Sequence, residues 1–82
     1  MKRTRTEKFI VTFGSTQDAM VMEKLGRSGC PGRLIPVPRS ISASCGLCWM
    51  CEKDQEEAVR IVIVEEELRY EGFHYVEMYW LE

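Results

Sequence analysis

Two helix-like segments, each enclosed by segments of alternating hydrophobicity, constrain the fold of this chain more than any other feature. The first is predicted over residues 16–28 and is closed by Gly29. The second ends at Tyr70 and is closed by Gly72. Each begins at a polar residue that is followed three positions later by a carboxylate, which is the spacing of a capping box. The sequence therefore predicts two amphipathic helices with defined ends.

The remaining segments have the patterns of strands. Residues 8–13, 47–52 and 73–81 alternate between two faces, and residues 33–37 form a short extended stretch. Pro36 cannot donate a ladder hydrogen bond, so this stretch is expected at a sheet edge. The order is strand, helix, strand, strand, helix, strand. In one small domain it predicts an α+β fold, a ferredoxin-like βαββαβ sandwich with a four-stranded antiparallel sheet and two helices on one face.

The length of 82 residues allows one domain. Residues 1–7 are basic and are expected to form a flexible end, so the single domain is predicted over residues 8–82. The last strand is apolar on both faces, and only one face can pack on the helices. We therefore expect a homodimer through the open sheet face or a sheet edge.

Charge and hydropathy argue against two classes of partner. The net charge of −2 provides no basic field for nucleic acid. No stretch is long and apolar enough to span a membrane, and the basic start lacks the apolar stretch of a secretory signal. These features favour the cytoplasm, where thiols stay reduced.

Three of the four cysteines lie within seven positions. Cys45, Cys48 and Cys51 have C-x₂-C-x₂-C spacing, which occurs in iron–sulfur proteins, and Cys30 is a candidate fourth ligand. A metal or iron–sulfur protein, with a cluster or zinc as cofactor, is therefore one alternative. Against it, a strand over residues 47–52 would direct Cys48 and Cys51 to opposite faces. Both would then be small buried residues.

Several segments carry a family resemblance. They are Phe13-Gly14-Ser15-Thr16, Ala19, Met22-Glu23-Lys24, Leu34-Ile35-Pro36-Val37-Pro38-Arg39 and Ile41-Ser42-Ala43-Ser44-Cys45-Gly46. Over roughly residues 8–80 the chain resembles a small bacterial family of selenium/sulfur carrier-like domains. The resemblance implies a carrier that holds sulfur or selenium on Cys45 as a persulfide or perselenide. It implies donor and acceptor proteins as partners, no cofactor, and a carrier in place of a stand-alone enzyme.

The residues around Cys45 suit a reactive thiol. Gly46 lets the backbone turn amides toward the sulfur, Ser42 and Ser44 can donate hydrogen bonds, and Arg39 is a nearby cation.

Two further alternatives remain open for this cluster. Cys48, in C-x-x-C spacing with Cys45, is a candidate resolving thiol. The other alternative is that the whole domain is a regulatory ligand-binding module without cysteine chemistry.

Overall fold

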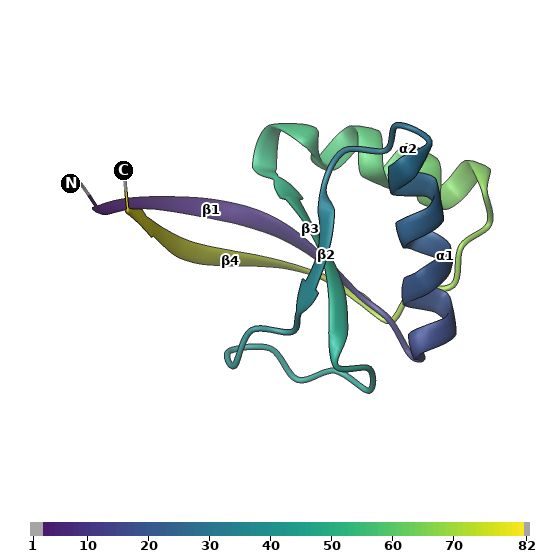
Figure 1. Ribbon diagram of the computed structural model, residues 1–82, viewed down its shortest axis with the longest axis horizontal. Helices are drawn as coiled ribbons and strands as arrows, with labels where there is room; N and C mark the ends of the chain where they lie inside the picture. The colour runs from purple at the N-terminus through teal and green to yellow at the C-terminus, as the bar shows by residue number, and fades with distance from the viewer. Residues whose placement is uncertain (1–2, 82) are drawn as a thin grey trace.

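The computed structural model describes the backbone of residues 3–81 and the side chains of residues 6–78. Its four strands form one antiparallel sheet of order β2-β3-β1-β4, and both helices cover the same face (Figure 1). The elements are β1 Arg3–Thr12, α1 Thr16–Arg27, β2 Arg33–Pro36, β3 Leu47–Glu52, α2 Glu56–Glu65 and β4 Gly72–Leu81, with a 3₁₀ turn at Lys53–Gln55 before α2. The predicted ferredoxin-like α+β fold is confirmed.

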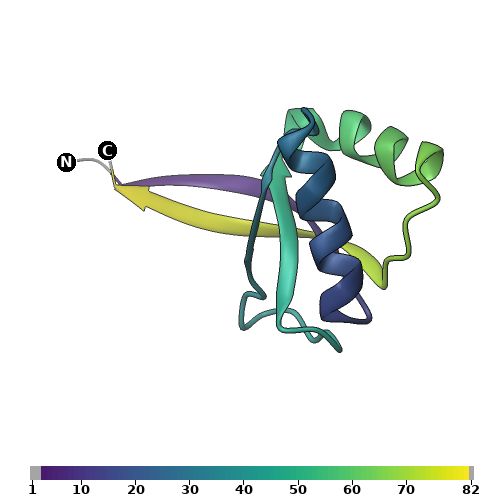
Figure 2. The same ribbon diagram turned by 45° about the vertical axis from the view of Figure 1, so that its right-hand side comes forward.

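Strand β1 is the centre of the sheet and is longer than predicted. It begins at Arg3 instead of Lys8, and it pairs with β4 from Arg3 to Thr12. Strand β3 pairs with β1 only from Lys8 to Thr12. The outer halves of β1 and β4 consequently leave the sheet as a two-stranded arm, formed by Arg3–Glu7 and Glu77–Leu81 (Figure 2). Residues 1 and 2 of the expected terminal segment lie outside the described residues.

Helix α1 begins and ends as its sequence predicts. The Ser15 hydroxyl accepts a hydrogen bond from the Asp18 amide at 3.2 Å. At the other end Gly29 has a φ of 118°, a conformation that glycine adopts without a Cβ clash. The Cys30 amide then donates to the Leu25 carbonyl at 3.1 Å, which completes a Schellman motif.

Helix α2 is shorter than predicted, because it ends at Glu65 and not at Tyr70. Glu67 has a φ of 52°, and the Leu68 amide donates to the Ile63 carbonyl at 3.0 Å, so this end is also a Schellman motif. Three successive glutamates at the negative end of the helix dipole disfavour continuation. The apolar Leu68 side chain turns back onto the core instead.

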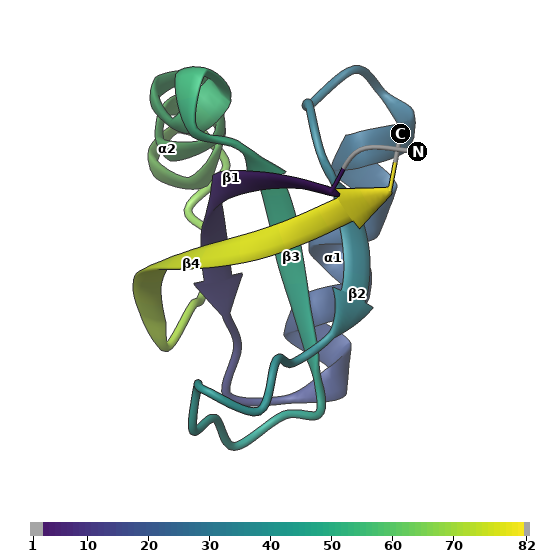
Figure 3. The same ribbon diagram turned by 90° about the vertical axis from the view of Figure 1, so that its left-hand side faces the viewer.

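The sheet has a buried cluster on each face. The helix-side cluster contains residues from β1, β3 and both helices, with Phe9, Val11, Trp49, Met22 and Val59 among its members. The opposite face carries a smaller cluster of Ile10, Cys48 and Met50, against which side chains of β2, the β2–β3 loop and β4 pack. Figure 3 views the sheet from the side on which β4 lies in front and α1 lies behind β3. In this way the sheet holds a thin core on both sides, as expected for a chain of this length. Among the described residues, no helix has the length and apolar character that a membrane span requires.

The Trp49 side chain closes the helix-side core at the end of α1. Its indole N–H donates to the Pro31 carbonyl at 2.9 Å. A Cβ atom at either Gly26 or Gly32 would overlap the ring, so the ring lies directly against the backbone at both positions. This contact fixes the turn that connects α1 to β2, and with it the position of Cys30.

Candidate functional site

The Cys45 thiol lies where β1 ends and α1 begins. Cys45 is the penultimate residue of the loop that connects β2 to β3, and its amide donates to the Phe13 carbonyl at 3.3 Å. The Leu47 amide donates to the Cys45 sulfur at 3.4 Å, and the Thr16 hydroxyl lies 3.8 Å from the same sulfur. Thr16 is the first residue of α1. The sulfur therefore has an amide donor, a hydroxyl and the positive end of a helix dipole around it, a setting that suits a sulfur anion.

Burial limits access to this thiol. Only 5% of the Cys45 surface is exposed, and the side chain belongs to the helix-side core cluster. The residues immediately before and after it, Ser44 and Gly46, are exposed. The Cys45 side chain is thus buried in the core, while the residues on either side of it in the sequence lie at the surface.

Ser44 connects the loop to a distant part of the chain. Its amide donates to Glu71 Oε1 at 3.0 Å, and its hydroxyl donates to Glu71 Oε2 at 2.5 Å. The Glu71 amide in turn donates to the Thr12 carbonyl at 2.6 Å, which anchors it to the end of β1. The two hydrogen bonds from Ser44 hold the pKa of the Glu71 carboxyl below its usual range. The carboxylate therefore stays ionised and binds the loop as a charged acceptor.

The other residues expected at the site lie on the surface of the loop. Arg39, Ser42 and Gly46 are exposed, and among the described residues no contact of Arg39 or Ser42 with the sulfur is seen. Gly46 accepts a hydrogen bond from the Val37 amide at 3.0 Å and does not adopt a left-handed conformation. The amide that contacts the sulfur belongs to Leu47, the next residue. The roles predicted for Arg39 and Ser42 stay predictions.

Sequence reasoning missed three groups at this site. They are the Thr16 hydroxyl, the Leu47 amide and the Glu71 carboxylate. Thr16 stands in one of the quoted family segments, and this was the only signal available for it. Glu71 is 27 positions from Ser44, and no spacing in the sequence connects the two.

Cysteines 48 and 51 lie on opposite faces of β3, as the alternation of the strand predicts. Cys48 is fully buried on the open sheet face, whereas Cys51 belongs to the helix-side cluster. Burial, with a smaller contribution from Cys45, raises the pKa of Cys48 to about 11. Burial, with nearby negative groups, raises the pKa of Cys51 to about 12. Both thiols are therefore neutral near pH 7, as expected of packing residues.

The metal alternative needs Cys45, Cys48, Cys51 and Cys30 to converge on one point, and the structure does not bring the four together. Cys30 follows the C-terminal end of α1, whereas Cys45 contacts its first residue. A helix of 12 residues is about 18 Å long. Among the residues that the structure describes, no group of three or more His, Cys, Asp or Glu side chains is placed to hold a metal ion. The spacing in the sequence thus does not become a ligand set in the fold.

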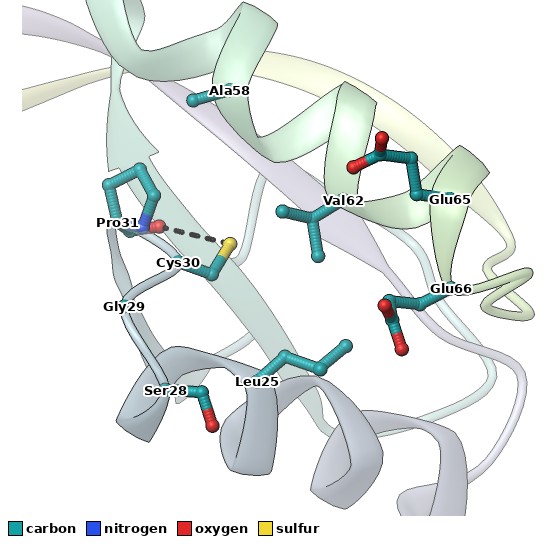
Figure 4. Close-up of a pocket in the computed structure, with 9 residues that line it drawn as sticks. All are labelled: Leu25, Ser28, Gly29, Cys30, Pro31, Ala58, Val62, Glu65 and Glu66. Carbon is teal, nitrogen blue, oxygen red and sulfur yellow. Dashed lines mark hydrogen bonds between the residues drawn. The ribbon is translucent and has the colours of Figure 1, made fainter.

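Cys30 lies in a pocket of about 330 Å³ between the end of α1 and α2 (Figure 4). Leu25 and Val62 supply apolar walls, and Glu65 and Glu66 lie along the α2 side. Burial raises the pKa of the Cys30 thiol. The negative end of the α1 dipole also disfavours an anion here. Cys30 and Cys45 therefore have opposite electrostatic settings at the two ends of one helix.

The fold and this thiol define a class of protein before any comparison is made. It is a small α+β sandwich with one cysteine held at the N-terminus of its first helix, between a strand end and an exposed loop. Residues 8–75 match the family described as "Putative Se/S carrier protein-like", and the chain belongs to that family. The match includes Thr16, Ser44, Cys45 and Glu71. No curated protein and no solved structure matched the chain.

Proposed function

We propose that this protein carries activated sulfur or selenium between partner proteins, as a persulfide or perselenide on Cys45. Membership of the selenium/sulfur carrier-like family supports a carrier role. The observation that carries the assignment to Cys45 is its position at the positive end of α1, with the Leu47 amide and the Thr16 hydroxyl at its sulfur. Cys30, Cys48 and Cys51 lack this setting, and burial raises the pKa of each.

The loading step needs only a thiolate and a donor protein. The Cys45 thiolate attacks the outer sulfur of a persulfide on the donor. A new S–S bond forms to Cys45, the S–S bond of the donor breaks, and the donor cysteine leaves as a thiolate. The outer sulfur keeps its proton, so the exchange consumes no oxidant or reductant. With selenium as the outer atom, an S–Se bond to Cys45 forms and the S–Se bond of the donor breaks.

The delivery step reverses the role of Cys45. A nucleophile of the acceptor protein attacks the outer sulfur or selenium, and Cys45 leaves as a thiolate. The Leu47 amide and the Thr16 hydroxyl stabilise the leaving sulfur as its negative charge develops. Both steps take their second reactant from a partner protein, so we assign this chain the role of carrier and its partners the enzymatic turnover.

Intact mass under non-reducing conditions tests this function. Protein purified anaerobically should gain the mass of one sulfur or selenium atom, and a reductant should remove it. Cys45→Ser should abolish the gain, whereas the control Cys30→Ser should retain it. Elemental analysis of the same sample identifies the atom. Four unmodified thiols after exposure to a persulfide donor, or stoichiometric iron or zinc, would contradict the carrier function.

We further propose that the chain forms a homodimer through the arm of Arg3–Glu7 and Glu77–Leu81. Two facts support this proposal. The Arg3–Glu7 part of β1 pairs with β4 alone within the described sheet, and a two-stranded ribbon by itself is marginally stable. Packing against a second copy would give this ribbon the tertiary support that it lacks by itself. Sedimentation equilibrium should detect a dimer, and a pure monomer at high concentration would overturn the proposal.

A further inference from the structure

A carrier thiol has to be reached by two partner proteins, yet Cys45 is only 5% exposed. A persulfide on the donor cannot approach a sulfur covered to this degree. The loop segment that carries Cys45 must move in each transfer, and the contacts that hold this segment against the core oppose that movement. The contacts of Ser44, the residue before Cys45, identify the group that does so.

Glu71 holds the segment with two hydrogen bonds from one residue. The Ser44 amide and hydroxyl donate to the two different carboxylate oxygens, at 3.0 and 2.5 Å. A bidentate contact to an ionised acceptor fixes orientation as well as position. Two backbone bonds also hold the segment: the Cys45 amide donates to the Phe13 carbonyl at 3.3 Å, and the Gly46 carbonyl accepts from the Val37 amide at 3.0 Å.

Glu71 is anchored by its backbone, and its contact with Ser44 lies at the surface. The Glu71 amide is bonded to the Thr12 carbonyl at 2.6 Å, so Glu71 is anchored at the ends of β1 and β4. Ser44 and Glu71 are both exposed. A partner protein can therefore reach the contact between Ser44 and Glu71 from the surface.

We propose that Glu71 is a positioning residue that holds the Ser44–Cys45 segment against the helix-side core, where the Cys45 side chain is buried, and that release of Ser44 from Glu71 exposes Cys45. The inference rests on the proposed carrier function, since it explains how partners reach a covered carrier thiol. It assigns to the α2–β4 connection a role at a site formed by the β2–β3 loop and α1. The partner that opens the loop is one that competes for a surface carboxylate, as a lysine or arginine side chain does.

Alkylation kinetics at single cysteines test this role in the full chain. Iodoacetamide labelling at fixed pH, followed by peptide mass spectrometry, gives a rate for each of the four thiols. Glu71→Ala should raise the Cys45 rate about tenfold, the factor that about 1.4 kcal/mol of lost closure corresponds to. The rates at Cys30 and Cys51 should not change. A variant that merely destabilised the fold would raise all four rates together, so these two thiols report global unfolding.

Two companion variants separate the contact from a general loss of charge. Ser44→Ala should raise the Cys45 rate on its own and should add little in the Glu71→Ala background, because the two residues form one contact. Glu57→Ala removes an exposed carboxylate from α2 and should leave the Cys45 rate unchanged. An unchanged or lower Cys45 rate in Glu71→Ala, or a parallel rise at all four thiols, would overturn the proposal.

The labelling experiment is independent of sulfur transfer, so the two proposals can fail separately. A faster Cys45 in Glu71→Ala, with no sulfur or selenium ever gained by the wild-type chain, would retain the closing role and remove the carrier function. A sulfur gain on Cys45 with no effect of Glu71→Ala on labelling would support the carrier function and remove the role proposed for Glu71.

Discussion

At the scale of single residues, the end of α1 at which a cysteine lies decides what its thiol can do. Cys45 contacts the first residue of the helix, where the dipole favours negative charge. Cys30 follows the last turn, where the dipole opposes it. Cys48 and Cys51 are buried within β3, and burial raises the pKa of both thiols. The α1 dipole thus distinguishes Cys45 from Cys30.

Glu71 should titrate below its usual range. Both hydrogen bonds from Ser44 favour the charged carboxylate, and this lowers its pKa from the ordinary value of 4.5. For a lowered pKa, the contribution to stability is complete above the unfolded value and is lost as pH falls through the folded value. The Ser44 amide chemical shift, followed by NMR, should therefore titrate with a midpoint below 4.5. A midpoint at or above 4.5 would show that the Ser44 contact is absent in solution.

Cys48→Ala should leave the loading of Cys45 intact. Cys48 is fully buried on the open sheet face, and burial keeps its pKa at about 11, so it supplies little thiolate near neutral pH. We expect a cost of about 1 kcal/mol in the free energy of unfolding from the small cavity. Urea unfolding measures this cost, and intact mass measures the sulfur gain. If loading is retained but a Cys45–Cys48 disulfide seen in the wild type disappears, the resolving role predicted from C-x-x-C is supported instead.

At the scale of elements, both helices end in the same motif with different residues at its critical position. Gly29 has the left-handed conformation after α1, and Glu67 has it after α2. A side chain in this region costs about 1–2 kcal/mol relative to glycine. The chain tolerates that cost at Glu67 because Leu68 is thereby packed against the core.

The pair of helix ends provides a matched test. Glu67→Gly should raise the free energy of unfolding by about 1 kcal/mol, because it removes the left-handed strain and one carboxylate from the negative end of α2. Gly29→Ala should lower it by a similar amount. Thermal unfolding of both variants measures these changes. A loss of stability in Glu67→Gly would mean that α2 continues beyond Glu65 in solution.

At the scale of the whole molecule, stability is unevenly distributed between the sheet and the β2–β3 loop that carries Cys45. Strand β1 is paired on both sides from Lys8 to Thr12, and Ile10 at its centre is fully buried. The loop of residues 37–46 has no regular structure and is held by a few hydrogen bonds. A domain of this size has roughly 5 kcal/mol of net stability, so a local opening of the loop costs far less than unfolding the sheet.

Native-state hydrogen exchange should show this difference directly. The Ile10 amide should exchange only through global unfolding, whereas the amides of Ser44 and Cys45 should exchange through local opening at a lower free energy. Low denaturant concentrations should accelerate Ile10 exchange much more than Cys45 exchange. Equal free energies at Ile10 and Cys45 would mean that the loop opens only when the sheet does, and the role given to Glu71 would then be wrong.

Part of the fold was predictable from the sequence because the signals are local. Alternation over residues 47–52 predicted β3 with its observed ends and directed Cys48 and Cys51 to opposite faces. Ser15 and Gly29 marked the start and end of α1. The end of α2 was predicted wrongly, because apolar residues at helical spacing continue through Leu68. In the structure the helix ends at Glu65, and the Leu68 side chain packs against the core beyond that end.

The sequence by itself determined the order and type of the elements, since hydrophobic periodicity and capping act between residues a few positions apart. It also indicated Cys45, through the family segments that surround it. Only the tertiary structure decided what surrounds the sulfur. Thr16 is 29 positions from Cys45, and Glu71 is 27 positions from Ser44. Such contacts depend on how β1, α1 and the α2–β4 connection meet in space, and no local pattern encodes that meeting.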